Sequence, residues 1–313
     1  MSEAIPHHSD TFESPLWPPK PSARAASHNI QSFLELQARA RPHDSALFWA
    51  QSSGAADWRA GRRRDMLHHA FSFQELQRKV AAVAHGFREL GIAHGVRVMV
   101  TAPNGPELYI ALMATQRLGA IPVLLDNWER PRLVEQCARE VDPRAFVGPA
   151  TSFALLGSVP ALHDVAIRIG IGAHTPSFFS GELSAFAQRS QGCEPVAVLP
   201  EDGALVRFST QGGTLSTGTL HTHRSLMGQS VLFAEMVPDG DEEIELSISL
   251  PRVLTNLTRG VASVVPAVDP AAPDQYDGQA LVEQMRFTGA PRCTLTPGLL
   301  RALAASASRR VEL

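Results

Sequence analysis

The stretch from Ala204 to Arg224 contains the residue types best suited to chemistry. A short apolar run, Ala204 to Phe208, predicts a buried strand, and a helical pattern begins near His223. Between them, Ser209 to Thr219 consists almost entirely of Ser, Thr and Gly. Glycine lets the backbone approach an anion closely, while amides and hydroxyls donate hydrogen bonds to its oxygens. A strand, a hydroxyl-rich loop and a helix in that order indicate a phosphate-binding site.

The sequence of this loop alone is compatible with other interpretations. A Ser- and Gly-rich segment is also typical of a flexible surface loop. Gly213 and Gly218 have the spacing of the outer glycines of a Walker loop, but Thr219 replaces the lysine which that loop requires. His221 and His223 could be paired metal ligands, yet no third ligand is near in sequence, and polarity at a helix start is the simpler account.

The elements around the loop alternate between strand and helix. Ser72 and Glu75 form a capping box at the start of a helix that Gly91 ends. The expected elements that follow are listed in chain order: strand 96–101, helix 106–118, strand 121–125, helix 132–141, strand 145–147 and strand 166–171. Residues 176–192 have the character of a surface linker. Strands that alternate with helices at these spacings predict an α/β fold with parallel sheets.

Composition excludes several classes of protein. The chain has 313 residues, 44% of them hydrophobic, which is enough for a sizeable core and for two subdomains. A net charge of −3 argues against a general nucleic-acid surface, and no apolar run approaches the length of a membrane span. The cysteines, Cys137, Cys193 and Cys293, are far apart and odd in number. They predict reduced thiols in a cytoplasmic protein rather than a metal site.

An ordered set of short motifs resembles the N-terminal region of the adenylate-forming superfamily. The set runs from Phe73-x-x-Leu76 through Gly91-Ile92-x-x-Gly95-Val-Arg-Val98 and Pro103-Asn104 to Leu118-Gly119-Ala120-Ile121-Pro122-Val123. The family has Y-x-E-L, L-G-V-x-x-G-D-R-V, P-N and L-G-A-V-x-V-P in the same order. The resemblance implies the large N-terminal α/β domain of these enzymes, with parallel-type sheets flanked by helices, here truncated.

The loop resembles the phosphate loop of the same superfamily, T-S-G-S-T-G-x-P-K-G-V followed by a His-rich helix start. Ser216 stands in place of the family's proline, and Thr217 in place of its lysine, so the loop lacks that cation. By resemblance, the ATP- and phosphate-binding residues are Thr210, Gly212, Gly213, Thr214, Thr217 and Gly218. No general base is assigned, because the carboxylate of the substrate is already the nucleophile.

The resemblance implies an ATP-dependent ligase that activates a carboxylic acid to acyl-AMP, with ATP and Mg as cofactors. Leu250-Pro251 is similar to the family's L-P-x-F-H segment, but Arg252-Val253-Leu254 follows. Olefin β-lactone synthetases also lack that histidine, and Val264-Val265-Pro266-x-x-Asp269-Pro270 resembles their sequence. The acid is therefore expected to be a fatty or β-hydroxy fatty acid.

The family continues past the point that corresponds to Leu313, with a Y-G-x-T-E motif, a ribose-binding aspartate, a hinge and a lysine-bearing lid. A second hypothesis follows: a catalytically inactive homologue that binds a partner in a biosynthetic pathway, the partner completing the truncated domain. The expected organisation is a mobile Pro-rich tail (1–28), one subdomain from 72–200, and a second, incomplete one from 29–71 plus 222–313. The phosphate-type loop, 201–221, would lie in the crevice between them.

Overall fold

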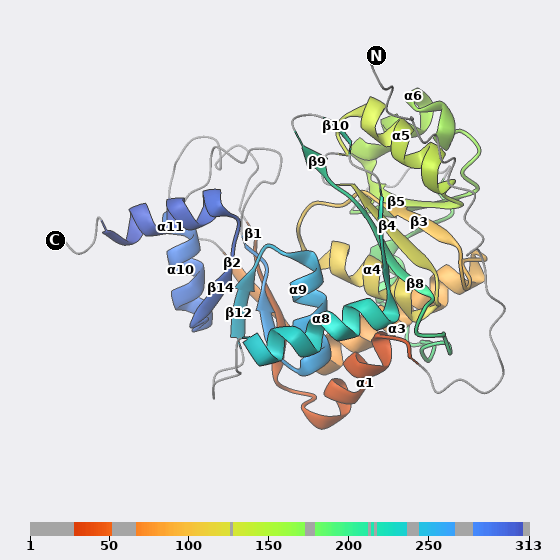
Figure 1. Cartoon of the computed structure of the whole chain (residues 1–313). Helices are drawn as coiled ribbons and strands as arrows, with labels where there is room; N and C mark the ends of the chain where they lie inside the picture. Colours follow the sequence, from red (N-terminus) through yellow and green to blue (C-terminus); the bar gives the residue numbers. More distant parts are fainter. Residues whose placement is uncertain are drawn as a thin grey trace, which may run out of the picture.

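In the described part of the chain, two large β-sheets have helices between and outside them, and a two-stranded hairpin forms a third, small sheet (Figure 1). The computed structural model describes residues 28–51, 67–125, 128–172, 179–211, 214–215, 218–236, 244–266 and 278–308. The expected tail up to residue 27 lies outside the described residues. Residues 52–66, whose sequence contains Arg59, Arg62, Arg63 and Arg64, also lie outside them. Within the described ranges, no helix combines the length and the apolar composition of a membrane span.

The larger sheet has seven strands in the order β11-β8-β4-β3-β5-β6-β7. Its strands are β3 (Arg97–Val100), β4 (Ile121–Leu125), β5 (Ala145–Pro149), β6 (Ile167–Ile171), β7 (Gly181–Glu182), β8 (Gly203–Phe208) and β11 (Thr219–Thr222). All neighbours are parallel except β11, which runs antiparallel to β8. Helices α4 (Pro106–Arg117) and α5 (Pro131–Val141) connect successive parallel strands, so the predicted parallel α/β class is confirmed.

The smaller sheet has five strands in the order β14-β12-β13-β1-β2. They are β1 (Ser45–Gln51), β2 (Leu67–Ser72), β12 (Ile244–Ser247), β13 (Ala262–Val264) and β14 (Arg292–Thr294). Strand β1 pairs in parallel with β13, through Leu47 opposite Ser263, so the sheet joins residues from early and late in the chain. These are the two segments that the sequence assigns to one subdomain, whose boundaries stay a prediction.

One layer of helices lies between the sheets and shares its core with both (Figure 1). Its helices are α1 (Gln31–Ala40), α3 (Phe73–Glu89), α4 and α9 (Leu250–Arg259). The common core includes Leu34, Leu47, Phe87, Val98, Leu112 and Leu254, which come from all four helices and from both sheets. The two sheets therefore share this central core, in addition to the separate clusters on their outer faces.

The outer faces of the sheets are covered by further helices. Helices α5 and α6 (Ala154–Ser158), with the 3-10 turns Ala150–Phe153 and Pro160–Leu162, cover the seven-stranded sheet around Val134 and Phe146. Helices α10 (Gly278–Thr288) and α11 (Pro297–Ser308) cover the five-stranded sheet through Leu281 and Leu299. Helix α8 (His223–Met236) packs on β8, β11 and α9.

Local signals at helix ends are confirmed, and one loop prediction is wrong. The Ser72 side chain accepts from the Glu75 amide at 3.2 Å and Glu75 accepts from the Ser72 amide at 2.9 Å, which completes the predicted capping box. The expected linker 176–192 instead contains β7 and the short helix α7 (Leu183–Ala187) in its described part. Phe186 of α7 is buried and packs edge-on against Phe87. The segment is therefore anchored by only two buried apolar residues, Leu183 and Phe186, which are too few to show a helical period in the sequence.

Asn29 ties the first described residues to the end of α4. Its side chain is fully buried, and Nδ2 shares its hydrogens among the carbonyls of Gln116 at 3.0 Å, Arg117 at 3.2 Å and Val196 at 3.1 Å. Its Oδ1 accepts from the amide of Gln31 at 3.0 Å. The last carbonyls of a helix have no partner within the helix, and those of Gln116 and Arg117 accept from the amides of Gly119 and Val196, both at 2.9 Å. Asn29 adds a second donor to each of these two carbonyls and so ties the start of the described chain to the end of α4.

We expect Asn29→Asp to lower the free energy of unfolding by about 3 kcal/mol, although the side chains have the same shape. A carboxylate has no hydrogen to donate and would face carbonyl oxygens. Denaturant unfolding above the pKa of a carboxyl group measures the loss. Gln136→Glu, at an exposed site on α5, adds the same charge and should change stability little. Equal stabilities of the Asn29→Asp variant and the unmodified protein would show that the amide hydrogens are not needed.

Candidate functional site

The hydroxyl-rich stretch forms a hairpin at the carboxyl end of β8. Strands β9 (Thr210–Gln211) and β10 (Thr214–Leu215) pair antiparallel, with Leu215 opposite Thr210. The chain then returns along β8 as β11, with Thr219 opposite Arg207. Figure 1 shows β9 and β10 at one end of the seven-stranded sheet, near α5. Ligands of parallel α/β sheets bind at the carboxyl ends of the strands, so the hairpin lies at the edge where a ligand is expected.

The structure places only some of the six predicted phosphate-binding residues. The hairpin brings Thr210 and Thr214 onto neighbouring strands, and their backbone is described. Gly212, Gly213 and Thr217 lie outside the described residues. Gly218 lies directly before β11.

The prediction that the loop leads straight into a helix is wrong. Helix α8 begins at His223, as expected, but β11 separates it from the hairpin. Pairing with β8 from Thr219 onward carries the chain away from the hairpin before the helix begins. The amides at the start of α8 are therefore not next to the hairpin, and any phosphate contacts at the hairpin come from its own amides and hydroxyls.

Gly218 makes a hydrogen bond and a close packing contact with residues outside the loop. Its amide donates to Glu140 Oε1 of α5 at 3.2 Å. A Cβ at this position would lie 2.6 Å from Cζ of Phe208, closer than real Cβ contacts. The backbone therefore passes so close to the Phe208 ring that only glycine fits at position 218. The acceptor of the Gly218 amide is a carboxylate, which is an anion.

His223 has a structural role that its position in the predicted site did not suggest. Its side chain is fully buried, and Nδ1 accepts from the Ile30 amide at 3.2 Å. Burial lowers the pKa of His223 to about 4, and the nearby Asp202 only partly offsets that effect. The histidine is neutral at physiological pH and holds the start of α8 to the segment before α1.

Metal binding and thiol chemistry have no support in the described residues. No group of three or more His, Cys, Asp or Glu side chains in those ranges could hold a metal ion, so the paired-ligand hypothesis for His221 and His223 gains nothing. Cys137, Cys193 and Cys293 are free, and burial raises the pKa of Cys137 to about 12. A thiol with so high a pKa is a packing group rather than a nucleophile.

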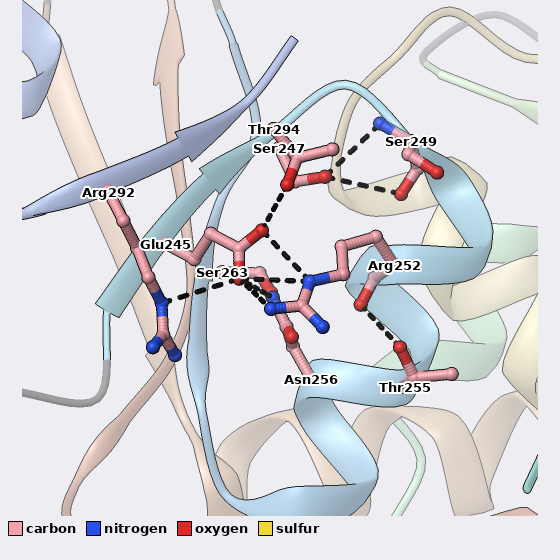
Figure 2. A network of polar contacts seen from close by, with 9 residues as sticks. All are labelled: Glu245, Ser247, Ser249, Arg252, Thr255, Asn256, Ser263, Arg292 and Thr294. Carbon is pink, nitrogen blue, oxygen red and sulfur yellow. Dashed lines mark hydrogen bonds and ion pairs between the residues drawn. The ribbon is translucent and has the colours of Figure 1, made fainter. Parts of the chain in front are cut away.

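A buried ion pair occupies the segment that resembles the family's L-P-x-F-H motif (Figure 2). Arg252, in the first turn of α9, donates from Nε to Glu245 Oε1 at 2.9 Å and from Nη2 to Oε2 at 2.6 Å. Both side chains are at most 3% exposed. Val253 and Leu254, which replace the aromatic residue and histidine of the motif, are buried in the core. This segment thus anchors α9 and contains no histidine.

Further polar groups surround the carboxylate of Glu245 (Figure 2). Thr294 Oγ1 donates to Oε1 at 2.6 Å, and Asn256 Nδ2 donates to Oε2 at 3.2 Å. Burial alone would raise the pKa of Glu245, but the hydrogen bonds from Arg252 and Thr294 outweigh burial and hold it below its usual value. The network joins α9 to β12, and through Thr294 to β14. In the sequence, the signal for this network is an arginine inside an otherwise apolar segment, which does not reveal its partner Glu245.

A cavity of about 460 Å³ lies away from the hairpin, between α1, α8 and α9. Its lining includes Phe33, Met227 and Val231, with Arg224 and Arg259 also present. No described residue of the hydroxyl-rich stretch contributes to its walls. We therefore assign it no part in phosphate binding.

Comparison with known proteins matches residues 34–311 to the family described as AMP-binding enzyme. The chain is 29% identical over 284 residues to an olefin beta-lactone synthetase of Stenotrophomonas maltophilia (strain K279a), covering 88% of this chain and 49% of that protein. The chain spans about half the length of the curated relatives that it matches in this way.

Solved structures show the same fold. The apo structure of MbtA from Mycobacterium smegmatis has a TM-score of 0.71 at 23% identity, covering 90% of this chain and 50% of that one. A long-chain-fatty-acid-CoA ligase (FadD1) from Archaeoglobus fulgidus has a TM-score of 0.73 at 18% identity, covering 92% and 56%.

We expect Arg252→Met to lower the free energy of unfolding by about 3–5 kcal/mol, because it leaves the buried carboxylate of Glu245 without its main partner. Arg139→Met, which breaks the exposed pair with Glu135, should cost under about 1 kcal/mol. Denaturant unfolding of both variants measures the difference. The double variant Arg252→Met with Glu245→Leu should recover part of the loss. A similar, small loss in the two single variants would contradict a buried ion pair.

We also expect stability to fall as the pH falls from about 6.5 to about 4, since the unfolded chain binds a proton at His223 that the folded chain excludes. The loss from this residue reaches up to about 3 kcal/mol. In His223→Gln the contribution disappears, while an amide oxygen can still accept from Ile30. Unfolding at about pH 7 and about pH 4.5 tests this. Parallel pH profiles of the variant and the unmodified protein would refute it.

Proposed function

The chain belongs to the AMP-binding enzyme family, and we propose that it binds ATP and activates a carboxylic acid as its acyl-adenylate. This is the family of adenylate-forming ligases, and the relatives of this chain include an olefin beta-lactone synthetase and a fatty acid ligase. The observation that carries the proposal is the position of the hydroxyl-rich hairpin. It lies at the carboxyl end of β8 in a parallel sheet, within the 278-residue stretch (34–311) that matches the family.

In the proposed reaction, a carboxylate oxygen attacks the α-phosphorus of ATP. The new P–O bond forms as the bond to the bridging oxygen breaks, and pyrophosphate leaves with the electron pair. No general base is needed, because the nucleophile is already ionised. Amides and hydroxyls of Thr210, Gly212, Gly213, Thr214, Thr217 and Gly218 would bind the phosphates. Their donors would stabilise charge that develops on the phosphate oxygens.

One contact of Gly218 supports the proposal that this loop binds phosphate. The Gly218 amide already donates to a carboxylate oxygen, and no side chain intervenes there because a Cβ would clash with Phe208. Mg²⁺ bound to ATP would neutralise part of the phosphate charge. We assign no residue of this chain to Mg²⁺.

The acid that we propose is a fatty or β-hydroxy fatty acid. The similarity to an olefin beta-lactone synthetase covers 88% of the chain, and a long-chain-fatty-acid-CoA ligase shares the fold. We further propose a cytoplasmic location, in agreement with the free cysteines. The acceptor of the acyl group is left unassigned.

A second candidate is a non-catalytic relative that forms a complex with another protein in a biosynthetic pathway. One feature favours it: residues 209–219 contain no Lys or Arg, since Thr217 occupies the position of the family's lysine. A hydroxyl can donate a hydrogen bond but supplies no charge to offset that of the phosphates.

ATP–pyrophosphate exchange with a panel of fatty and β-hydroxy fatty acids separates the two candidates. We expect exchange in the unmodified protein and an increase of roughly a hundredfold in Thr217→Lys, as for other contacts to developing charge. Thr151→Lys, at an exposed site distant in sequence, adds the same charge and should leave the rate unchanged. Absence of exchange in both the unmodified protein and Thr217→Lys would overturn the catalytic proposal in favour of the second candidate.

A further inference from the structure

We propose that Glu140 determines how strongly this site binds phosphate, because its carboxylate competes with a phosphate oxygen for the Gly218 amide. The inference rests on the proposed function, in which that amide contributes to an anion site. Glu140 is 78 residues from Gly218 in the sequence, and the two meet through the packing of α5 beside the hairpin. It is thus a specificity-determining residue that the loop sequence does not contain.

Glu140 and Phe208 both lie close to the backbone of Gly218. Glu140 Oε1 lies 3.2 Å from the Gly218 nitrogen, within hydrogen-bond distance. A Cβ on residue 218 would lie 3.1 Å from the same oxygen and 2.6 Å from the Phe208 ring. The absence of a side chain at Gly218 therefore lets the carboxylate reach the amide, while the Phe208 ring limits how far the backbone can retreat.

Helix stability does not explain an acidic residue at this position. Glu140 lies in the last turn of α5, which ends at Val141. The partial charge at a helix C-terminus is negative, so a carboxylate there is unfavourable and a basic residue is preferred. Arg139, the basic residue in that turn, pairs with Glu135 instead. Among the described residues Glu140 takes part in no ion pair.

The charges around the Gly218 amide explain why its contact with Glu140 affects the affinity for phosphate. The neighbouring loop, 209–219, carries no basic residue, so nothing on the loop offsets the Glu140 carboxylate. One N–H cannot donate fully to two acceptors, and two anions a few ångströms apart repel each other. A phosphate must therefore displace Glu140 from Gly218, and it binds less tightly than the hairpin alone would allow.

Calorimetric titration of the full chain with inorganic pyrophosphate tests the proposal. We expect Glu140→Gln to bind pyrophosphate about tenfold more tightly than the unmodified protein, and Glu140→Lys more tightly again, with both differences shrinking at high salt. The matched controls are Glu129→Gln and Glu129→Lys, which make the same charge changes at an exposed residue just before α5. They should leave the affinity nearly unchanged.

Amide hydrogen exchange without ligand gives an independent readout. We expect a peptide that contains Gly218 to exchange several-fold faster in Glu140→Gln, because its amide loses an acceptor, and at the unmodified rate in Glu129→Gln. Unchanged exchange together with unchanged pyrophosphate affinity in Glu140→Gln would overturn the proposal. Equal affinity gains in the Glu129 variants would also overturn it, since they would show an effect of net charge alone.

The outcomes also separate this inference from the proposed function. Tighter pyrophosphate binding in the Glu140 variants, with no ATP–pyrophosphate exchange for any acid, would support the role of Glu140 and reject catalysis. Exchange in the unmodified protein, with no effect of Glu140→Gln on pyrophosphate affinity, would support catalysis and reject the role of Glu140. No pyrophosphate binding even in Glu140→Lys would reject Gly218 as an anion site.

Discussion

One apolar layer of helices packs against both large sheets and sets the positions of the other elements. Every residue of α4 from Leu108 to Arg117 is buried, so this helix has no face left for solvent. Helix α3 packs beside it and carries a buried face from Phe73 to Phe87. Because both sheets contribute to the same core, neither can move relative to the helices without exposing apolar surface. The positions of β4 and its neighbour β8 are fixed by this arrangement.

Buried polar groups then join the segments that hydrophobic packing alone would leave poorly oriented. Asn29 connects the start of the described chain to the end of α4, and His223 connects the same region to the start of α8. On the other sheet, the carboxylate of Glu245 holds α9 against β12 and β14 through Arg252 and Thr294. A buried polar group without partners is costly, so such networks select one arrangement of the elements over others. These contacts help to position β8 and therefore the hairpin that follows it.

Regular elements with a clear period could be predicted from the sequence, and contacts between distant residues could not. Strands β3, β4, β5, β6 and β8, the helices α4 and α5 and the capping box at Ser72 follow from local patterns that act over a few residues. Helix α7 was missed because two buried residues, Leu183 and Phe186, show no period. The return of β11 along β8 was missed because Thr-Leu-His-Thr has no strand pattern that distinguishes it from a loop. The site shows the same division, since the hydroxyl-rich loop was visible in the sequence, whereas Glu140 reaches Gly218 only through the fold.

We propose that phosphates bind to backbone amides at the end of β8. The most direct measurement is the NMR signal of the Gly218 amide in protein isotope-labelled at glycine, followed during titration with Mg·ATP and, separately, with adenosine. We expect the Gly218 signal to shift with Mg·ATP and to stay in place with adenosine, because the amide would contact phosphate and not the base or ribose. A Gly218 signal that is unchanged at saturating Mg·ATP, while other glycine signals shift, would place the nucleotide elsewhere and contradict the account.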